Sequence, residues 1–231
     1  MNHRLVEIYD QLFHAAKTEI QDGQGLSIDS FLLKPAGDNR RGMTLLIRPS
    51  AEIMQALQRI QHQIQAVLPN QYFYPLNDLH FTVLSLVSCT PDFDAKELSL
   101  RKYIDLVQEA IFGHQAFQLN LRGLTMTRSA IMAQGFFPSG SLDHIRDHLR
   151  TVFHASDLYH TIDRRYKLET AHSTLIRFSN SVLNRAPLLP LIEQLRQIEI
   201  GAFPVTDLQL VSNDWYLRQQ HTHLLATFPL H

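Results

Sequence analysis

A unit that occurs twice is the feature that most constrains how this chain can fold. In each copy a predicted strand ends at a Pro-Ser pair, a helix follows, and the next predicted strand carries the pattern His-x-Thr. The first copy has its Pro-Ser pair at 49–50 and then His80, and the second has the pair at 138–139 and then His172. Aligned on these histidines, LHFTVLSL and AHSTLIRF share the histidine, the threonine and two aliphatic residues after it. Internal similarity of this kind predicts a fold with two related halves.

The hydrophobic pattern of the whole chain places helices and strands around these two units. Helices are expected at about 3–18, 50–67, 95–112, 141–154 and 187–199. Strands are expected at about 43–49, 79–87, 116–125, 130–137, 170–178, 203–211 and 221–228. Short connections between neighbouring strands argue against a doubly wound parallel sheet. The expected fold class is α/β (α+β in its layers), with two pseudo-symmetric lobes, each a mainly antiparallel sheet with helices on its outer side.

Composition and charge limit the kind of ligand. The chain has 21 Lys and Arg against 22 Asp and Glu, a formal net charge of −1. A protein that binds long nucleic acid through many phosphates usually has a basic excess, so a nucleic-acid ligand is expected to be short or held locally. The single cysteine, Cys89, excludes an internal disulfide and suits a reducing compartment. Without a signal peptide or a long apolar stretch, the protein is expected to be cytoplasmic, with no membrane partner.

Each His-x-Thr pattern puts an imidazole and a hydroxyl on the same side of its strand, because side chains two residues apart share a face. If the two copies face each other, His80 and Thr82 converge with His172 and Thr174. One neutral imidazole could take a proton from an attacking oxygen, while a protonated one delivers a proton to the leaving oxygen. The hydroxyls could donate to the non-bridging phosphate oxygens, where charge builds in the transition state. This set of groups is suited to phosphodiester chemistry without a metal.

The segments HFTV at 80–83 and HSTL at 172–175 resemble the two His-x-Thr/Ser-x signatures of the 2H phosphoesterase superfamily. That superfamily includes the bacterial 2′-5′ RNA ligase and RNA 2′,3′-cyclic phosphodiesterase proteins. The resemblance runs from about residue 43 to residue 230. It implies a bilobal fold with two antiparallel sheets around a cleft that holds both motifs. It also implies that the two histidines are the acid/base pair and that the two threonines bind phosphate.

The resemblance leaves residues 1–40 outside the shared pattern, as an N-terminal helix and loop extension, and assigns 41–231 to a single bilobal domain. It implies a metal-independent phosphoesterase that acts on a 2′,3′-cyclic phosphate or a 2′-5′ phosphodiester. The near-neutral charge favours short RNA ends or small cyclic nucleotides as substrates, and no obligate protein partner is expected. Two alternatives stay open: a non-catalytic module that binds RNA ends or nucleotides, and a metal-dependent hydrolase that uses other histidines. No Gly-rich nucleotide-binding loop is present in the sequence, so no cofactor is expected.

Two further residues are candidates for substrate binding. Arg165 belongs to the charged run 163–167 before the second motif, and an arginine there could steer a phosphate. Tyr74 is the last of three aromatic residues before the first motif and could supply a ring for base stacking. His144 and His148 are spaced i, i+4 on a predicted helix, but they lack an HExxH frame and are better explained as a solvated helix face. No metal site is expected.

Overall fold

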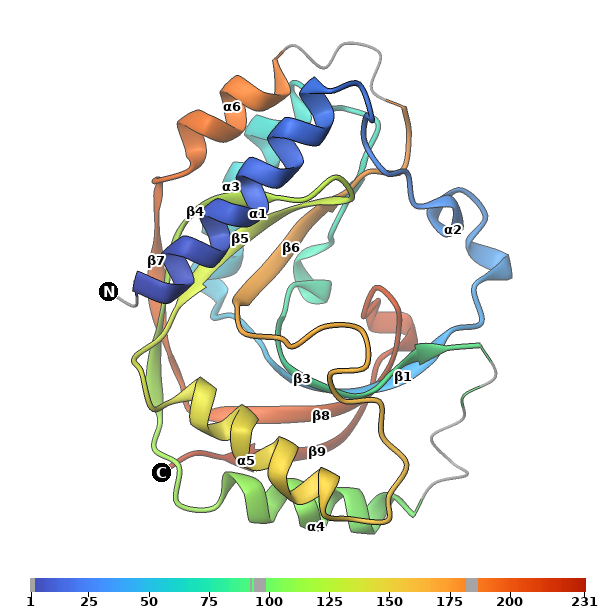
Figure 1. Ribbon diagram of the computed structural model, residues 1–231, viewed down its shortest axis with the longest axis vertical. Helices are drawn as coiled ribbons and strands as arrows, with labels where there is room; N and C mark the ends of the chain where they lie inside the picture. Colours follow the sequence, from blue (N-terminus) through green and yellow to red (C-terminus); the bar gives the residue numbers. More distant parts are fainter. Residues whose placement is uncertain (1–2, 92, 94–98, 182–186) are drawn as a thin grey trace.

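The computed structural model describes residues 3–91, 93, 99–181 and 187–231 (Figure 1). Its α-helices are α1 (His3–Gln21), α2 (Ser30–Leu33), α3 (Ala51–Gln65), α4 (Leu100–Ile111), α5 (Leu142–His154) and α6 (Leu188–Leu195). Its strands are β1 (Arg41–Ile47), β2 (Tyr72–Phe73), β3 (Phe81–Thr90), β4 (Phe117–Met126), β5 (Ala130–Phe136), β6 (Ala171–Arg177), β7 (Glu199–Val205), β8 (Asp207–Asp214) and β9 (His223–Pro229). Short 3-10 turns are η1 (Pro35–Gly37), η2 (Leu76–Asp78) and η4 (Gln219–His221). The expected start of the helix at 95–112 lies outside the described residues.

The strands form two sheets that face each other (Figure 1). One sheet has four strands in the order β3-β1-β8-β9, and the other has five in the order β2-β6-β5-β4-β7. The described pairings are all antiparallel. Strands β1 and β3 of the first repeated unit are neighbours in the four-stranded sheet, and β5 and β6 of the second are neighbours in the five-stranded sheet. The predicted fold class, two lobes each built on an antiparallel sheet, is confirmed.

The helices cover the outer faces of the sheets, but each repeated unit sends its helix to the sheet of the other unit. Helix α3, between β1 and β3 in the chain, packs against β6 and β7, and α5, between β5 and β6, packs against β3. Helices α1 and α6 pack against β4, and α4 packs against α5 and β9. Figure 1 shows α1, α3 and α6 gathered at the five-stranded sheet, and α4 and α5 at the four-stranded sheet. Each half of the fold therefore depends on the other for its outer cover.

Helix α3 illustrates how local sequence builds these elements. Ser50 is its N-cap, and the side-chain oxygen accepts a hydrogen bond from the backbone N–H of Ile53 at 3.4 Å. The side chains of Ile53, Leu57, Ile60 and Ile64 recur at helical spacing and are all buried. This apolar stripe holds α3 to the neighbouring sheet through the loss of exposed apolar surface.

Helix α1 belongs to the same hydrophobic core. Its buried face repeats every three to four residues, from Leu5 to Ile20. Tyr9, near the middle of this face, is fully buried, and its hydroxyl lies 2.9 Å from the carbonyl oxygen of Ala171 and 3.1 Å from that of Gly135. The first helix is thereby tied to β5 and β6, the pair of strands that holds the second motif.

The C-terminal part of the chain differs from the expectation. The helix expected at 187–199 ends at Leu195, and β7, which was not predicted as a separate strand, follows it. The sequence pattern did not indicate this strand because it contains Gly201 and Pro204, and both residue types are unfavourable inside strands. Strand β7 lies at the edge of the five-stranded sheet, where a proline need not interrupt a hydrogen-bonded ladder. One residue after β7, the chain enters β8 of the other sheet.

Candidate active site

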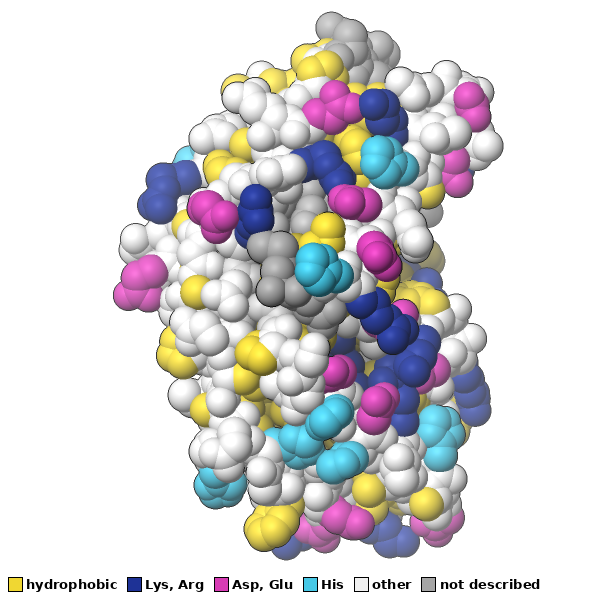
Figure 2. All heavy atoms as spheres, turned by 60° about the vertical axis from the view of Figure 1, so that its left-hand side comes forward, with side chains coloured by type: hydrophobic (Ala, Val, Ile, Leu, Met, Phe, Trp, Pro, Cys, Tyr) yellow, Lys and Arg dark blue, Asp and Glu magenta, His cyan; other side chains and the backbone are white. Residues whose placement is uncertain are grey.

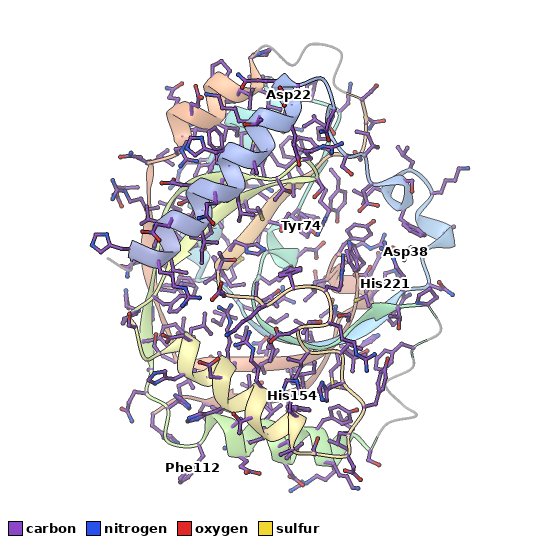
Figure 3. All side chains as sticks on the ribbon, in the orientation of Figure 1. Asp22, Asp38, Tyr74, Phe112, His154 and His221 are labelled. Carbon is purple, nitrogen blue, oxygen red and sulfur yellow. The ribbon has the colours of Figure 1, made fainter. Side chains whose placement is uncertain are left out.

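A cavity of about 690 Å³ brings the two motifs together. His80 and Thr82 line it from the side of the four-stranded sheet, and His172 and Thr174 line it from the five-stranded sheet. Tyr74, which also lines the cavity, lies in the space between the two sheets in Figure 3. The two repeated units therefore face each other, and their histidines and threonines line the same cavity.

His80 immediately precedes β3, one residue outside the strand on which the sequence placed it. Its Nδ1 lies 2.7 Å from the carbonyl oxygen of Asp78. A carbonyl oxygen can only accept, so the neutral imidazole donates through Nδ1–H and carries its lone pair on Nε2. Arg48 steadies this turn by donating to the carbonyl oxygens of Asn77 at 3.1 Å and Leu79 at 3.2 Å. The backbone thus selects one tautomer of His80.

His172 lies inside β6, and its Nδ1 is 2.8 Å from the hydroxyl oxygen of Thr170. A hydroxyl can donate or accept, so this hydrogen bond suits either neutral tautomer and also the imidazolium. The two histidines therefore differ in an important respect. The carbonyl of Asp78 holds neutral His80 in one tautomer, whereas neutral His172 keeps its hydrogen bond to Thr170 in either tautomer.

Burial lowers the pKa of both imidazoles. The pKa of His80 falls to about 4, mainly through desolvation, and the nearby cations Arg48 and Arg177 lower it further. The pKa of His172 also falls to about 4, first through desolvation and then through Arg146 and Arg177. At neutral pH both rings are neutral in the unliganded protein.

Both motif strands contain a β-bulge at the same position. The register of β3 with β1 skips Val83, and the register of β6 with β5 skips Leu175. In each strand the skipped residue directly follows the threonine of the motif. A bulge adds one residue to a strand, so the side chains beyond it change faces. The two repeated units thus also share a β-bulge, which the alternation of side chains along a strand does not predict.

The bulge in β6 explains a cavity residue that the sequence analysis missed. Arg177 follows His172 by an odd number of residues, so in a regular strand the two side chains would point to opposite faces. With the bulge at Leu175, Arg177 lines the cavity beside His172. Its Nε donates to the hydroxyl of Tyr74 at 3.1 Å, and it forms no ion pair with a carboxylate of the described residues. Arg177 therefore offers a positive charge to the cavity.

Tyr74 is a buried part of the cavity wall. Only 3% of its surface is exposed, and its ring packs edge-on against Tyr72 with the centroids 5.2 Å apart. Its hydroxyl accepts the hydrogen bond from Arg177. In this arrangement Tyr74 orients the arginine, and the base-stacking role expected from the sequence stays a prediction.

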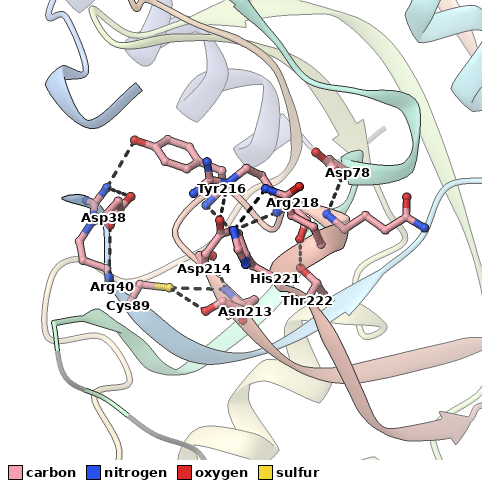
Figure 4. Close-up of polar contacts among 12 residues, drawn as sticks. Asp38, Arg40, Asp78, Cys89, Asn213, Asp214, Tyr216, Arg218, His221 and Thr222 are labelled. Carbon is pink, nitrogen blue, oxygen red and sulfur yellow. Dashed lines mark hydrogen bonds and ion pairs between the residues drawn. The ribbon is translucent and has the colours of Figure 1, made fainter. Parts of the chain in front are cut away.

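Arg165 lines the cavity from the segment before β6, where it lies against an indole ring. Its guanidinium carbon is 4.5 Å from the ring centroid of Trp215, which also lines the cavity. Arg40 lies 4.6 Å from the same ring, but it is paired with Asp38, as Figure 4 shows. Trp215 was not among the residues predicted from the sequence, because an isolated tryptophan outside a motif gives no signal of its position.

The other histidines that the sequence analysis considered lie elsewhere. His144 and His148 are exposed on α5, and Nδ1 of His148 is 3.0 Å from Nε2 of His114. Histidine side chains gather on the face shown in Figure 2. Within the part of the chain that the structure describes, no three or more His, Cys, Asp or Glu side chains are grouped so as to hold a metal ion. None of the described helices combines the length and the apolar character needed to cross a membrane.

Solved structures with this fold include TT0787 of Thermus thermophilus, at a TM-score of 0.62 and 19% identity over 82% of this chain and 97% of that one. The structure of E. coli LigT with 3′-AMP aligns at a TM-score of 0.57 and 17% identity, over 83% of this chain and 98% of LigT. A protein described as a phosphoesterase aligns at 0.55 and 18% identity, over 83% and 98% of the two chains. No family model matches the sequence, and no curated protein matches it either.

The fold is therefore the one that TT0787, LigT and this phosphoesterase share, in agreement with the fold that the resemblance of the two motifs implied. The chain is similar to TT0787 and to LigT over nearly the whole length of both proteins. At these identities the likeness concerns the fold, and the roles of individual residues follow from the chemistry of the cavity.

Proposed function

We propose that this protein is a metal-independent phosphoesterase that acts on a 2′,3′-cyclic phosphate or a 2′-5′ phosphodiester of RNA ends or small nucleotides. The observation that carries this proposal is the wall of one cavity, which combines two imidazoles, two threonine hydroxyls and Arg177. An arginine that forms no ion pair with a carboxylate of the described residues favours an anionic ligand, and its planar fork matches phosphate oxygens. E. coli LigT has been crystallised with 3′-AMP and with phosphate, which supports a phosphorylated ligand for this fold.

His80 is the general base in this proposal, and His172 is the general acid. The backbone bond to Nδ1 leaves the Nε2 lone pair of His80 to take a proton from an attacking water. The water oxygen then bonds to phosphorus, and one P–O bond of the cyclic phosphate breaks. The imidazolium of His172 delivers its Nε2 proton to the departing ribose oxygen, while Thr170 accepts from its Nδ1–H. A bound phosphate anion supports this step because it raises the pKa of the imidazole.

Turnover of 2′,3′-cyclic mononucleotides in the presence of EDTA tests the proposed function. We expect hydrolysis of at least one of the four common nucleotides, or of an oligonucleotide ending in a cyclic phosphate, followed by ³¹P NMR. A 2′-5′-linked dinucleotide is the second substrate class to assay. Binding without turnover of any of these substrates would favour the non-catalytic module. Loss of turnover on chelation, restored by zinc, would favour the metal-dependent hydrolase.

Thr82→Val and Thr174→Val are each expected to lower kcat by about 10²–10³-fold, the usual effect of removing one donor to a developing oxyanion. Valine keeps the β-branched shape of threonine and removes only the hydroxyl. Steady-state kinetics on the cyclic mononucleotide measures the loss. Thr125→Val is the matched control, because Thr125 is fully buried and does not line the cavity. A change of less than about threefold in both cavity variants would contradict the assignment.

Arg165→Gln is expected to raise KM by roughly threefold to tenfold and to leave kcat nearly unchanged, because an exposed cation attracts the substrate more than it stabilises the transition state. The increase should shrink as salt is added, since Arg165 is exposed to solvent. Arg164→Gln is the matched control: Arg164 is also exposed, but it lies over Tyr159 and does not line the cavity. Equal effects of the two substitutions would mean that Arg165 has no specific contact with the substrate.

A further inference from the structure

Arg146, on α5, is only 1% exposed and binds four backbone carbonyl oxygens. Its Nε donates to the carbonyl of Val83 at 2.7 Å, and Nη2 donates to that of Thr82 at 2.9 Å. Nη1 donates to the carbonyl of Glu169 at 2.8 Å, and Nη2 also donates to that of Thr170 at 2.8 Å. The first two carbonyls belong to β3, and the other two directly precede β6. One guanidinium therefore joins the backbone of β3 to the segment that leads directly into β6.

The burial of this charge needs an explanation, because a buried cation without a counter-ion is costly. Among the described residues, no carboxylate forms an ion pair with Arg146. Burial lowers the pKa of Arg146 to about 10, so the side chain stays charged at neutral pH. An apolar side chain would avoid burying a charge, but it would leave the four carbonyl oxygens without a donor. What the guanidinium adds is a rigid, planar set of donors that can hold several carbonyls in fixed directions.

The β-bulge explains why β3 requires such a partner. It leaves Val83 outside the regular ladder with β1, and the carbonyl of Val83 binds Arg146 instead. At the equivalent bulge in β6, the carbonyl of Leu175 accepts from Nε2 of Gln61 on α3 at 2.9 Å. Each bulge thus receives a buried side chain from the helix of the other repeated unit. Gln61 makes its second bond to the carbonyl of Tyr74, whereas Arg146 binds both β3 and the residue directly before β6.

These bonds lie next to the chemical groups of the cavity. Thr82 gives its carbonyl to Arg146 and carries its side chain in the cavity wall. Thr170 also gives its carbonyl to Arg146, and its hydroxyl is bonded to Nδ1 of His172. We propose that Arg146 is a positioning residue, whose fork fixes the separation of the two motifs so that both imidazoles meet the same phosphate. This inference rests on the proposed function for its kinetic test.

Arg146→Lys is the central variant, because lysine keeps the charge but cannot span four carbonyls with a planar fork. We expect kcat for the cyclic mononucleotide to fall by about 10–10²-fold, since a displacement near 1 Å has such an effect on a reaction that depends on orientation. KM should stay within about threefold, because Thr82, Thr174 and Arg177 still contact the phosphate. Thr125→Val removes another buried hydrogen bond, to the carbonyl of Tyr9 at 2.9 Å, and serves as the control for a loss of stability without a loss of kcat.

Arg146→Met removes both the charge and the guanidinium, so its comparison with Arg146→Lys shows which effects come from the charge. Removing the cation should raise the pKa of His172, which NMR titration of the imidazole measures, while Arg146→Lys should leave that pKa nearly unchanged. A role in stability alone would lower the melting temperature of both variants without lowering kcat of the folded protein. If either variant folds and keeps kcat within about twofold of the wild type, the proposal is overturned. If neither variant folds, Arg146 is needed for folding itself, and the positioning role is overturned as well.

A second readout separates this inference from the proposed function. If the wild-type protein hydrolyses none of the substrates, the proposed function fails, and NMR with inorganic phosphate tests Arg146 alone. We expect phosphate to shift the imidazole signals of both His80 and His172 in the wild type, and of at most one in Arg146→Lys. Equal shifts of both signals in the two proteins would overturn the positioning role.

Discussion

Replacing either His80 or His172 with alanine is expected to lower kcat for a 2′,3′-cyclic phosphate by about 10²–10⁴-fold, the usual contribution of one general acid or base. Each imidazole lies in the cavity wall with its Nδ1 bonded to the protein, so Nε2 is the nitrogen left for the substrate. In the proposed mechanism, alanine removes the proton carrier and leaves the threonines and Arg177 to bind phosphate. KM should therefore change far less than kcat, and steady-state kinetics measures both.

His144→Ala is the control for these two variants, because His144 is exposed on α5 and outside the cavity. It should keep the activity of the wild type. Circular dichroism should show that all three variants are folded. A variant at position 80 or 172 that kept more than about half of the wild-type turnover would refute the role of that imidazole.

The second large effect concerns pH: kcat/KM is expected to fall as the pH rises from about 5 to 8, by up to about tenfold per unit. Both histidines have their pKa lowered to about 4 in the unliganded protein. Above that value nearly every molecule has two neutral rings, and the fraction with one proton falls tenfold per pH unit. A reaction that needs one neutral and one protonated imidazole proceeds only through that fraction. The direction follows from desolvation, which favours the neutral form of histidine.

The profile of kcat should differ from that of kcat/KM, because kcat reports the protein with substrate bound. A bound phosphate anion favours the imidazolium, so the falling limb of kcat should lie at higher pH. Both profiles are measured at constant ionic strength, over the range in which circular dichroism shows a folded protein. A flat kcat/KM from about pH 5 to 8, with chemistry shown to be rate-limiting, would contradict the two-histidine mechanism.

The motif residues could be predicted from the sequence because the signals that identify them are local and occur twice. His80 and His172 each lie two residues before a threonine, on or beside a strand recognisable from its aliphatic residues. Most elements near the motifs were predicted to within a few residues, since apolar spacing and an N-cap such as Ser50 depend on neighbours in the chain. Strand β7 was missed for the same reason: its glycine and proline are unfavourable locally and are accommodated at a sheet edge.

The residues that only the tertiary structure identified depend on pairing and burial. Arg177 lines the cavity because a bulge changes the alternation of β6, and a bulge is set by the register with the neighbouring strand. Arg146 is the one charged residue on the buried, otherwise apolar face of α5, and the helical pattern does not show what it binds. Its four carbonyl partners come from two segments that are distant in the sequence. Because α3 and α5 each pack against the sheet of the other repeated unit, their side chains reach carbonyls that are distant in the sequence.

The sequence by itself therefore determined the repeated unit, the class of fold and the four motif side chains, because each depends on residue type and on spacing along the chain. The tertiary structure decided which helix covers which sheet, which tautomer His80 adopts and how far the pKa values of the histidines fall. These properties arise from desolvation and from hydrogen bonds between segments that are far apart in the chain. Their strength depends on distance and direction in space, which a linear pattern of residues does not contain.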